Sequence, residues 1–193
     1  MTDLELKNII NEYKKLKKEH PDLHIEYCLQ QNSLEDTIKI AAQSVNHLNK
    51  IHPHQHRVGR KKLNKFANEL VNHVSEFEKA NNFDNVYNII SKVNMHGIGA
   101  LTCYDTALRI CSKISYKNNF FPDKIYLHAG TRIGAKKLIG NKKLKGKQFI
   151  YKNDLPDVLK NSELTPSELE DILCCFIAKG EFCSCLSEKA EIF

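Results

Sequence analysis

Apolar residues recur at helical spacing along most of the chain. The first stripe comprises Leu6, Ile9, Ile10, Tyr13 and Leu16. Residues three or four positions apart lie on one face of a helix, so this stripe predicts an amphipathic helix. Thr2 and Glu5 have the spacing of a capping box at its start, and Pro21 ends it.

Two further stripes predict two more helices before residue 80. One comprises Leu34, Ile38, Ala41, Ala42, Val45 and Leu48, with Ser33 and Asp36 as caps. The other comprises Leu63, Phe66, Ala67, Leu70, Val74 and Phe77. The polar pair Asn81 and Asn82 follows, and we expect it to form a short loop before the next helix.

A fourth stripe leads into a turn that contains two glycines. The stripe comprises Val86, Ile89, Ile90 and Val93. Gly97 and Gly99 flank Ile98, and neither glycine has the Cβ atom that hinders left-handed backbone and close approach. Thr102, with Asp105 three residues on, forms nearly a capping-box arrangement, so we expect it to open a second helix. This region therefore predicts a helical hairpin.

The part of the chain after residue 120 predicts shorter elements. The segment 125–128 suits a short strand or the start of a helix, and 148–151 suits a short extended piece. Thr131 is the expected N-cap of a helix that ends near Gly140. Thr165, followed by Pro166 and then Glu168, predicts the start of the last long helix.

These patterns predict an all-α fold, namely a helical bundle that contains a helix-hairpin-helix motif. One or two very short strands are compatible with this prediction. We expect a single domain over residues 1–193. Its parts are a helical lobe at 1–80, a hairpin region at 83–140 and a C-terminal helical segment at 148–193.

The composition limits the partners and the cellular location that we expect for this protein. The net charge is +6 and the sequence pI about 8.9, which permits a polyanionic partner. No apolar run has the length of a membrane span, and the N-terminus is too charged for a signal peptide. The cysteines number seven, and Cys174, Cys175, Cys183 and Cys185 cluster without a Cys-x-x-Cys pair. We therefore expect reduced thiols, a cytoplasmic location, no cofactor and no membrane partner.

Three histidines at alternate positions, His52, His54 and His56, precede a basic stretch. One interpretation is a metal site, because imidazole binds zinc, nickel or iron. The sequence nearby supplies no cysteine or carboxylate to complete a ligand set, and Pro53 disrupts a helix there. We therefore expect no metal, and a loop that contacts nucleic acid or braces the helices instead. His54 and His56 are then candidates for substrate binding.

The hairpin turn resembles a known motif. The run Met-His-Gly-Ile-Gly-Ala-Leu-Thr-Cys at 95–103 is similar to the Leu-Pro-Gly-Val/Ile-Gly-x-x-Thr-Ala signature of helix-hairpin-helix DNA-binding proteins, which include DNA glycosylases. The resemblance extends from Val86 to Ile114 and departs from the signature at His96 and Cys103. It implies binding of duplex DNA through the turn residues His96, Gly97, Ile98, Gly99, Ala100 and Thr102. The basic residues that we expect to extend this surface are Arg57, Arg60, Arg132, Lys136 and Lys137.

The resemblance also implies a reaction. Glycosylases of this family flip a nucleotide out of the duplex and cut its base–sugar bond. An acidic residue roughly twenty positions beyond the second hairpin glycine faces that nucleotide, and Asp123 lies twenty-four positions beyond Gly99. Tyr126 and His128 would stack on or hydrogen-bond the flipped base. Leu101 stands where some members carry a lysine that forms a Schiff base, so the expected enzyme is a monofunctional hydrolase.

Two other functions remain open. The protein is alternatively a DNA- or RNA-binding module without catalytic activity. A weaker alternative is a metal-dependent hydrolase built on the histidines at 52–56.

Overall fold

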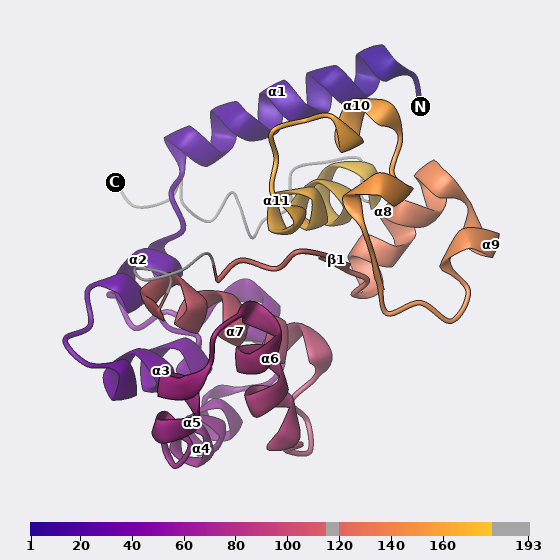
Figure 1. Cartoon of the computed structure of the whole chain (residues 1–193). Helices are drawn as coiled ribbons and strands as arrows, with labels where there is room; N and C mark the ends of the chain where they lie inside the picture. The colour runs from indigo at the N-terminus through magenta and orange to yellow at the C-terminus, as the bar shows by residue number, and fades with distance from the viewer. Residues whose placement is uncertain (115–119, 179–193) are drawn as a thin grey trace. The chain divides into compact units, whose positions relative to one another are not determined.

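The computed structural model confirms an all-α fold with two very short strands (Figure 1), and it describes residues 1–114 and 120–178. The chain divides into two compact units. The terminal unit joins Met1–Pro21 to the chain from Pro122 onwards, and the central unit is Asp22–Phe121. The division falls at these two prolines rather than at the predicted segment boundaries. That the whole chain forms one domain stays a prediction.

The central unit contains six α-helices and one short 3-10 helix within its described residues. They are α2 Leu23–Leu29, α3 Leu34–Gln43, η1 Pro53–Gln55, α4 Arg60–Val71, α5 Val74–Lys79, α6 Phe83–Lys92 and α7 Ala100–Ile114. Helix α7 packs against α2, α3 and α6, and α3 also packs against α4. Large side chains that are fully buried between these helices include Ile38, Phe66, Leu70, Phe77, Ile90, Tyr104 and Ile110.

Three local features of the central unit differ from the predictions. The third predicted helix is divided into α4 and α5 around Asn72 and His73. Helix α3 ends at Ser44, whose backbone is left-handed (φ 55°), so Val45 lies beyond the helix and pairs with Ile51. Helix α2 was not predicted, and Asp22 caps it by accepting hydrogen bonds from the first-turn amides. Local backbone breaks thus override a continuous apolar pattern.

The terminal unit pairs the first helix of the chain with its last described elements. It contains α1 Asp3–Glu19, β1 Ile125–Tyr126, α8 Ala129–Ile139, α9 Asn141–Leu144, β2 Phe149–Ile150, η2 Lys152–Asp154, α10 Asp157–Lys160, α11 Pro166–Asp171 and the π-helix η3 Ile172–Ile177. The strands are antiparallel, with Ile125 opposite Ile150. Helix α1 packs against α10 and η3, and α8 packs against η3 (Figure 1).

Hydrogen bonds between distant residues hold this unit together. The Tyr13 hydroxyl donates to Asp171 at 2.8 Å, which ties α1 to the end of α11. The prediction that Thr131 is an N-cap is wrong. Thr131 lies buried inside α8, and its hydroxyl donates to Glu170. The capping box predicted for α1 is present, and α11 begins at the predicted start, where Thr165 and Glu168 also form a capping box.

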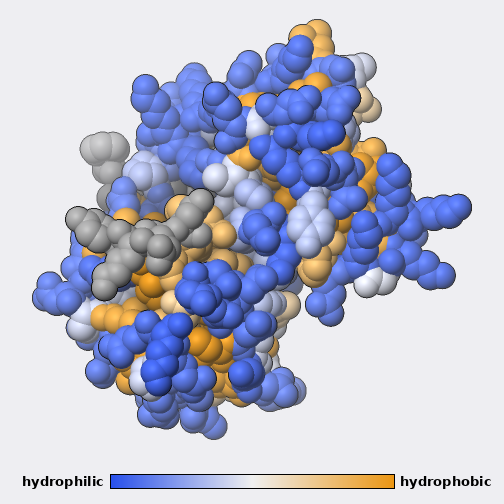
Figure 2. Space-filling model, viewed as in Figure 1, coloured by the Kyte–Doolittle hydropathy of each residue, from blue (hydrophilic) through white to orange (hydrophobic). Residues whose placement is uncertain are grey.

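The face seen in Figure 2 is largely polar. Figure 2 shows hydrophilic residues across most of the visible face, with smaller apolar areas between them. Within residues 1–114 and 120–178, no helix combines the length and the apolar content needed to cross a membrane. Among the clustered C-terminal cysteines, Cys183 and Cys185 lie outside the described residues.

Candidate functional site

The predicted hairpin is formed by α6 and α7. Two left-handed residues, Asn94 (φ 41°) and Gly97 (φ 88°), reverse the chain between the helices. The amide of Ile98 donates to the Met95 carbonyl at 3.0 Å and closes the turn. The first bond of α7 runs from the Cys103 amide to the carbonyl of residue 99. The turn residues His96, Gly97, Gly99 and Ala100 are exposed.

A lysine from another helix lies over this turn. A Cβ atom built on Gly97 would lie 2.7 Å from Nζ of Lys62, which belongs to the first turn of α4. Gly97 is required for its positive φ, and it also leaves room for this ammonium group, although the flexible lysine could move aside for a Cβ atom. The first-turn amides of an α-helix have no partner within the helix, and the N-terminus of α7 also carries the positive end of the helix dipole. Together with Lys62, it presents positive potential to solvent, which suits a phosphate.

Thr102 and Asp105 do not open α7, contrary to the prediction. The helix begins at Ala100, and Thr102 is buried inside its first turn. The Asp105 carboxylate points away from the helix start and accepts a hydrogen bond from Nε2 of Gln55 at 2.7 Å. The same oxygen lies 3.3 Å from Nδ1 of His54. Asp105 therefore serves a partly buried polar cluster of the central unit and not a cap.

This cluster contains two of the three alternate histidines. One ligand-type atom from each of His52, His54 and Asp105 lies within 4.8 Å of the others. The His54 amide donates to Nδ1 of His52 at 3.3 Å, and the two rings meet edge to face at 4.8 Å. The ring of His24 also packs edge to face against the ring of His52, with 4.8 Å between their centroids. The carboxylate missing from the nearby sequence thus comes from α7.

A buried arginine supports the cluster. Arg109, which is 3% exposed, donates to Oγ of Ser44 at 3.1 Å and to Oε1 of Gln55 at 3.4 Å. Gln55 therefore bridges Arg109 and Asp105 with its two amide atoms. This bridge fixes the orientation of the Asp105 carboxylate, because both ends of the amide are engaged.

The electrostatics of the cluster favour a neutral histidine beside an ionised carboxylate. Burial raises the pKa of Asp105, but the His54 hydrogen bond and the Arg109 charge outweigh it and bring that pKa to about 2. Burial, followed by the Arg109 charge, lowers the pKa of His52 to about 3, although Asp105 acts in the opposite direction. At neutral pH the His52 ring therefore keeps a lone pair, and Asp105 carries a full negative charge.

The other residues predicted around the histidines lie outside this cluster. His56 is exposed, and its Nε2 donates to the Ile51 carbonyl at 2.7 Å. Arg60 donates to the side-chain and backbone oxygens of Asn49, each at 2.7 Å, and so braces the loop before η1. Arg57 is exposed.

The remaining predicted residues belong to the terminal unit. Asp123 is exposed, whereas Tyr126 is buried and stacks with His128 at 6.3 Å. Arg132 donates to the carbonyls of residues 144 and 147, and Lys137 donates to those of residues 177 and 178, while Lys136 is exposed. The predicted catalytic residue and the hairpin thus belong to different units.

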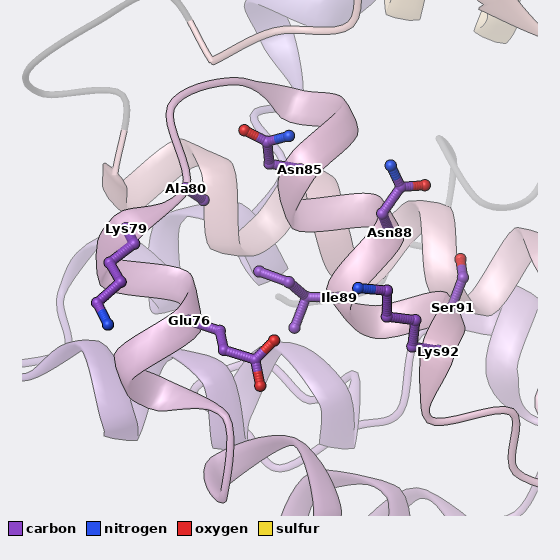
Figure 3. A pocket seen from close by; sticks show the side chains of 8 residues that line it. All are labelled: Glu76, Lys79, Ala80, Asn85, Asn88, Ile89, Ser91 and Lys92. Carbon is purple, nitrogen blue, oxygen red and sulfur yellow. The ribbon is translucent and has the colours of Figure 1, made fainter.

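A separate pocket lies between α5 and α6. Its volume is about 560 Å³, and Figure 3 shows Ile89 between Glu76 and Lys92. It is lined by Glu76, Lys79, Ala80, Asn85, Asn88, Ile89, Ser91 and Lys92. None of the predicted site residues is among them.

Comparisons with known proteins give no match: no family model, no curated protein and no solved structure is similar to this chain.

Proposed function

We propose that the central unit binds the phosphate backbone of a nucleic acid, with duplex DNA as the partner, through the α6–α7 hairpin. The observation that carries this proposal is the position of Lys62 over Gly97 at the exposed turn. A lysine ammonium group and the amides of a helix start are both groups that bind phosphate. The net charge of +6 favours the same class of partner.

The turn geometry is what a phosphate contact requires. Gly97 and Gly99 add no side chain of their own to an exposed turn, and Gly99 has no atom within 4 Å of where its Cβ would lie. A phosphate can therefore approach the amides at the start of α7 closely. Contacts of this type position a protein on nucleic acid and carry no sequence information. Binding should accordingly be similar for different sequences and should weaken steeply with salt.

Removal of a damaged or modified base is our proposal for a reaction on the bound DNA. One support is the motif resemblance at 95–103. The other is the presence of a candidate carboxylate, because its negative charge would stabilise the oxocarbenium character that develops on the sugar. Two carboxylates are candidates. Asp123 has the position that the resemblance implies, and Asp105 lies on α7 itself and is paired with His54. A histidine held by a carboxylate is suited to accept a proton from water.

The binding test compares the removal of a lysine beside the hairpin turn with the removal of a lysine on the terminal unit. Lys62→Ala should weaken binding of the full-length protein to duplex DNA and lower the slope of log K against log salt by about one. Lys7→Ala removes the same charge from the exposed face of α1 and should change neither quantity. Equal effects of the two substitutions would show that only net charge matters and would contradict the proposal.

A second variant tests the turn itself. Gly99→Ala adds a methyl group that meets no atom within 4 Å, so the variant should fold normally. That methyl group nevertheless lies at the surface where the phosphate would approach, and weaker binding to every duplex is expected. Unchanged binding in both Gly99→Ala and Lys62→Ala would remove the hairpin from the binding surface.

The catalytic part has its own test. Duplexes with different modified bases are incubated with the protein, and abasic sites are measured. Asp123→Asn and Asp105→Asn are then compared on any substrate that the wild-type protein cleaves. Loss of cleavage in one variant with DNA binding retained assigns the carboxylate. No abasic sites on any duplex would leave binding without catalysis as the function.

A further inference from the structure

We propose that His52, His54 and Asp105 form a binding site for a single divalent ion of the first transition series. The three side chains come from two segments of the central unit, η1 with its N-cap and the first half of α7. They are the one group of potential metal ligands of this kind within residues 1–114 and 120–178.

The spacing of the donor atoms suits a shared ion. One donor atom from each residue lies within 4.8 Å of the other two. In a tetrahedral zinc site, bonds of about 2.0 Å place neighbouring ligand atoms about 3.3 Å apart. Nδ1 of His54 and Oδ2 of Asp105 are 3.3 Å apart already. The donor atom of His52 lies within 4.8 Å of both and supplies the third ligand.

The ligands are held by neighbours of the kind that metal sites use. Gln55 donates to the Asp105 carboxylate, and Arg109 holds Gln55 from its other end. Hydrogen bonds to a ligating carboxylate orient it and tune its affinity. An ionised carboxylate has four lone-pair directions, so these bonds leave room for an ion.

His52 supplies an imidazole in a restricted position. Its ring is 9% exposed and packs between the rings of His24 and His54. Its Nδ1 accepts a long hydrogen bond from the His54 amide at 3.3 Å, and this bond is given up when an ion takes the lone pair. Because such a bond is weak, its loss is small beside a metal–nitrogen bond.

The donor set selects the type of ion. Two imidazoles and one carboxylate suit zinc, iron, cobalt or nickel, whereas magnesium and calcium prefer oxygen alone. Three protein ligands also leave positions for water, which is the arrangement of catalytic rather than structural sites. The His54 side chain is 27% exposed, so water can reach the ion from that side. The nearby positive charge of Arg109 reduces the affinity, since like charges repel.

The test is a titration of the metal-free full-length protein with Co²⁺, followed by visible absorption, and with Zn²⁺, followed by calorimetry. The wild-type protein should bind a single ion with the absorption of a site containing nitrogen ligands. His54→Ala and Asp105→Asn should each weaken binding by about a hundredfold or more, and Gln55→Leu by about ten- to a hundredfold. Mg²⁺ should not compete.

His73→Ala is the matched control. Nδ1 of His73 lies 2.6 Å from Glu76, a histidine–carboxylate pair like that of His54 and Asp105 but outside the three-residue group. Its removal should leave the affinity unchanged. Circular dichroism checks the fold, and His54→Gln replaces His54→Ala where the latter unfolds. The site would be overturned if the wild-type protein bound the ion no more tightly than His54→Gln does. It would also be overturned if His73→Ala lost as much affinity as His54→Ala.

Discussion

His54 and Asp105 lie fifty-one positions apart in the chain, yet Nδ1 of one is 3.3 Å from Oδ2 of the other. Each is partly exposed, with side-chain exposures of 27% and 13%. The contact therefore sits where α7 meets the segment around η1, between the interior and solvent. It joins the histidine segment to the helix that begins at the hairpin turn, so both proposals concern the same helix.

We predict that Arg109→Met destabilises the central unit by about 2–4 kcal/mol. The substitution leaves Ser44 and Gln55 without a buried donor and takes away the positive charge that favours ionised Asp105. Lys113→Met is the control on the same helix, because Lys113 donates only to backbone carbonyls near the surface. Urea unfolding measures both, and equal losses would contradict the role given to Arg109.

We predict that Gly134→Ala destabilises the terminal unit by about 1–3 kcal/mol or more. Gly134 is buried on α8, and a Cβ atom there would overlap the backbone carbonyl of Leu173. Helix α8 would have to move away from η3, since backbone cannot give way as a side chain does. Gly99→Ala, which meets no atom within 4 Å, should leave stability nearly unchanged. A Gly134→Ala protein with wild-type unfolding in urea would contradict this packing.

We predict that Cys28 and Cys103 resist alkylation in the folded protein at pH 8. Burial raises the pKa of Cys28 to about 12 and that of Cys103 to about 11. A raised pKa lowers the fraction of reactive thiolate, so labelling by iodoacetamide should be much slower than in urea. Mass spectrometry of peptides reads each site. Rapid labelling of Cys28 in the native protein would show that α2 opens readily.

We predict that Glu168 stabilises the terminal unit at neutral pH but not in acid. Burial raises the pKa of Glu168, but the Thr165 amide and Lys17 outweigh it, so the folded pKa lies below the usual 4.5. The unfolded chain therefore takes up a proton first as the pH falls. The stabilisation is present above about pH 4.5 and is lost as the pH falls through the lower folded pKa.

Glu168→Gln tests this pH dependence. Glutamine keeps the capping box but loses the ion pair with Lys17, so the variant should be about 0.5–1 kcal/mol less stable at pH 7. The difference should disappear once the pH has fallen below the lowered folded pKa of Glu168. Glu163→Gln removes a more exposed partner of α1, with a side chain 91% exposed, and should have no measurable effect. Thermal unfolding across pH compares the three proteins, and a constant difference for Glu168→Gln would contradict the linkage.

We predict that the basic residues outside the hairpin differ in their contribution to DNA binding. Arg57 and Lys136 are exposed, so neutralising each should reduce the salt slope by about one if it contacts a phosphate. Arg60 and Lys137 already hold backbone or amide oxygens of the protein. Their neutralisation should instead lower thermal stability. An unchanged slope for both Arg57 and Lys136 would assign them to ordinary surface.

The sequence alone determined several of the helices and some of their ends. Periodic apolar residues predict α1, α3, α4, α6 and α7, because burial of one helical face requires that spacing. Caps such as Thr2 with Glu5 were equally readable, since a cap and its partner are three residues apart. The hairpin turn was predicted from Gly97 and Gly99 for the same reason, as its geometry depends on neighbouring residues only.

Only the tertiary structure decided which polar side chains meet. Asp105 has helix-start spacing in the sequence, and its pairing with His54 and Gln55 depends on how α7 packs beside η1. The grouping of α1 with α10 and η3 is likewise set by packing between distant segments. A local sequence pattern predicts whether a residue is buried, but it does not predict which distant residue contacts it. The histidine segment therefore acquires its carboxylate, and Lys62 its place over Gly97, through contacts between helices that sequence periodicity does not encode.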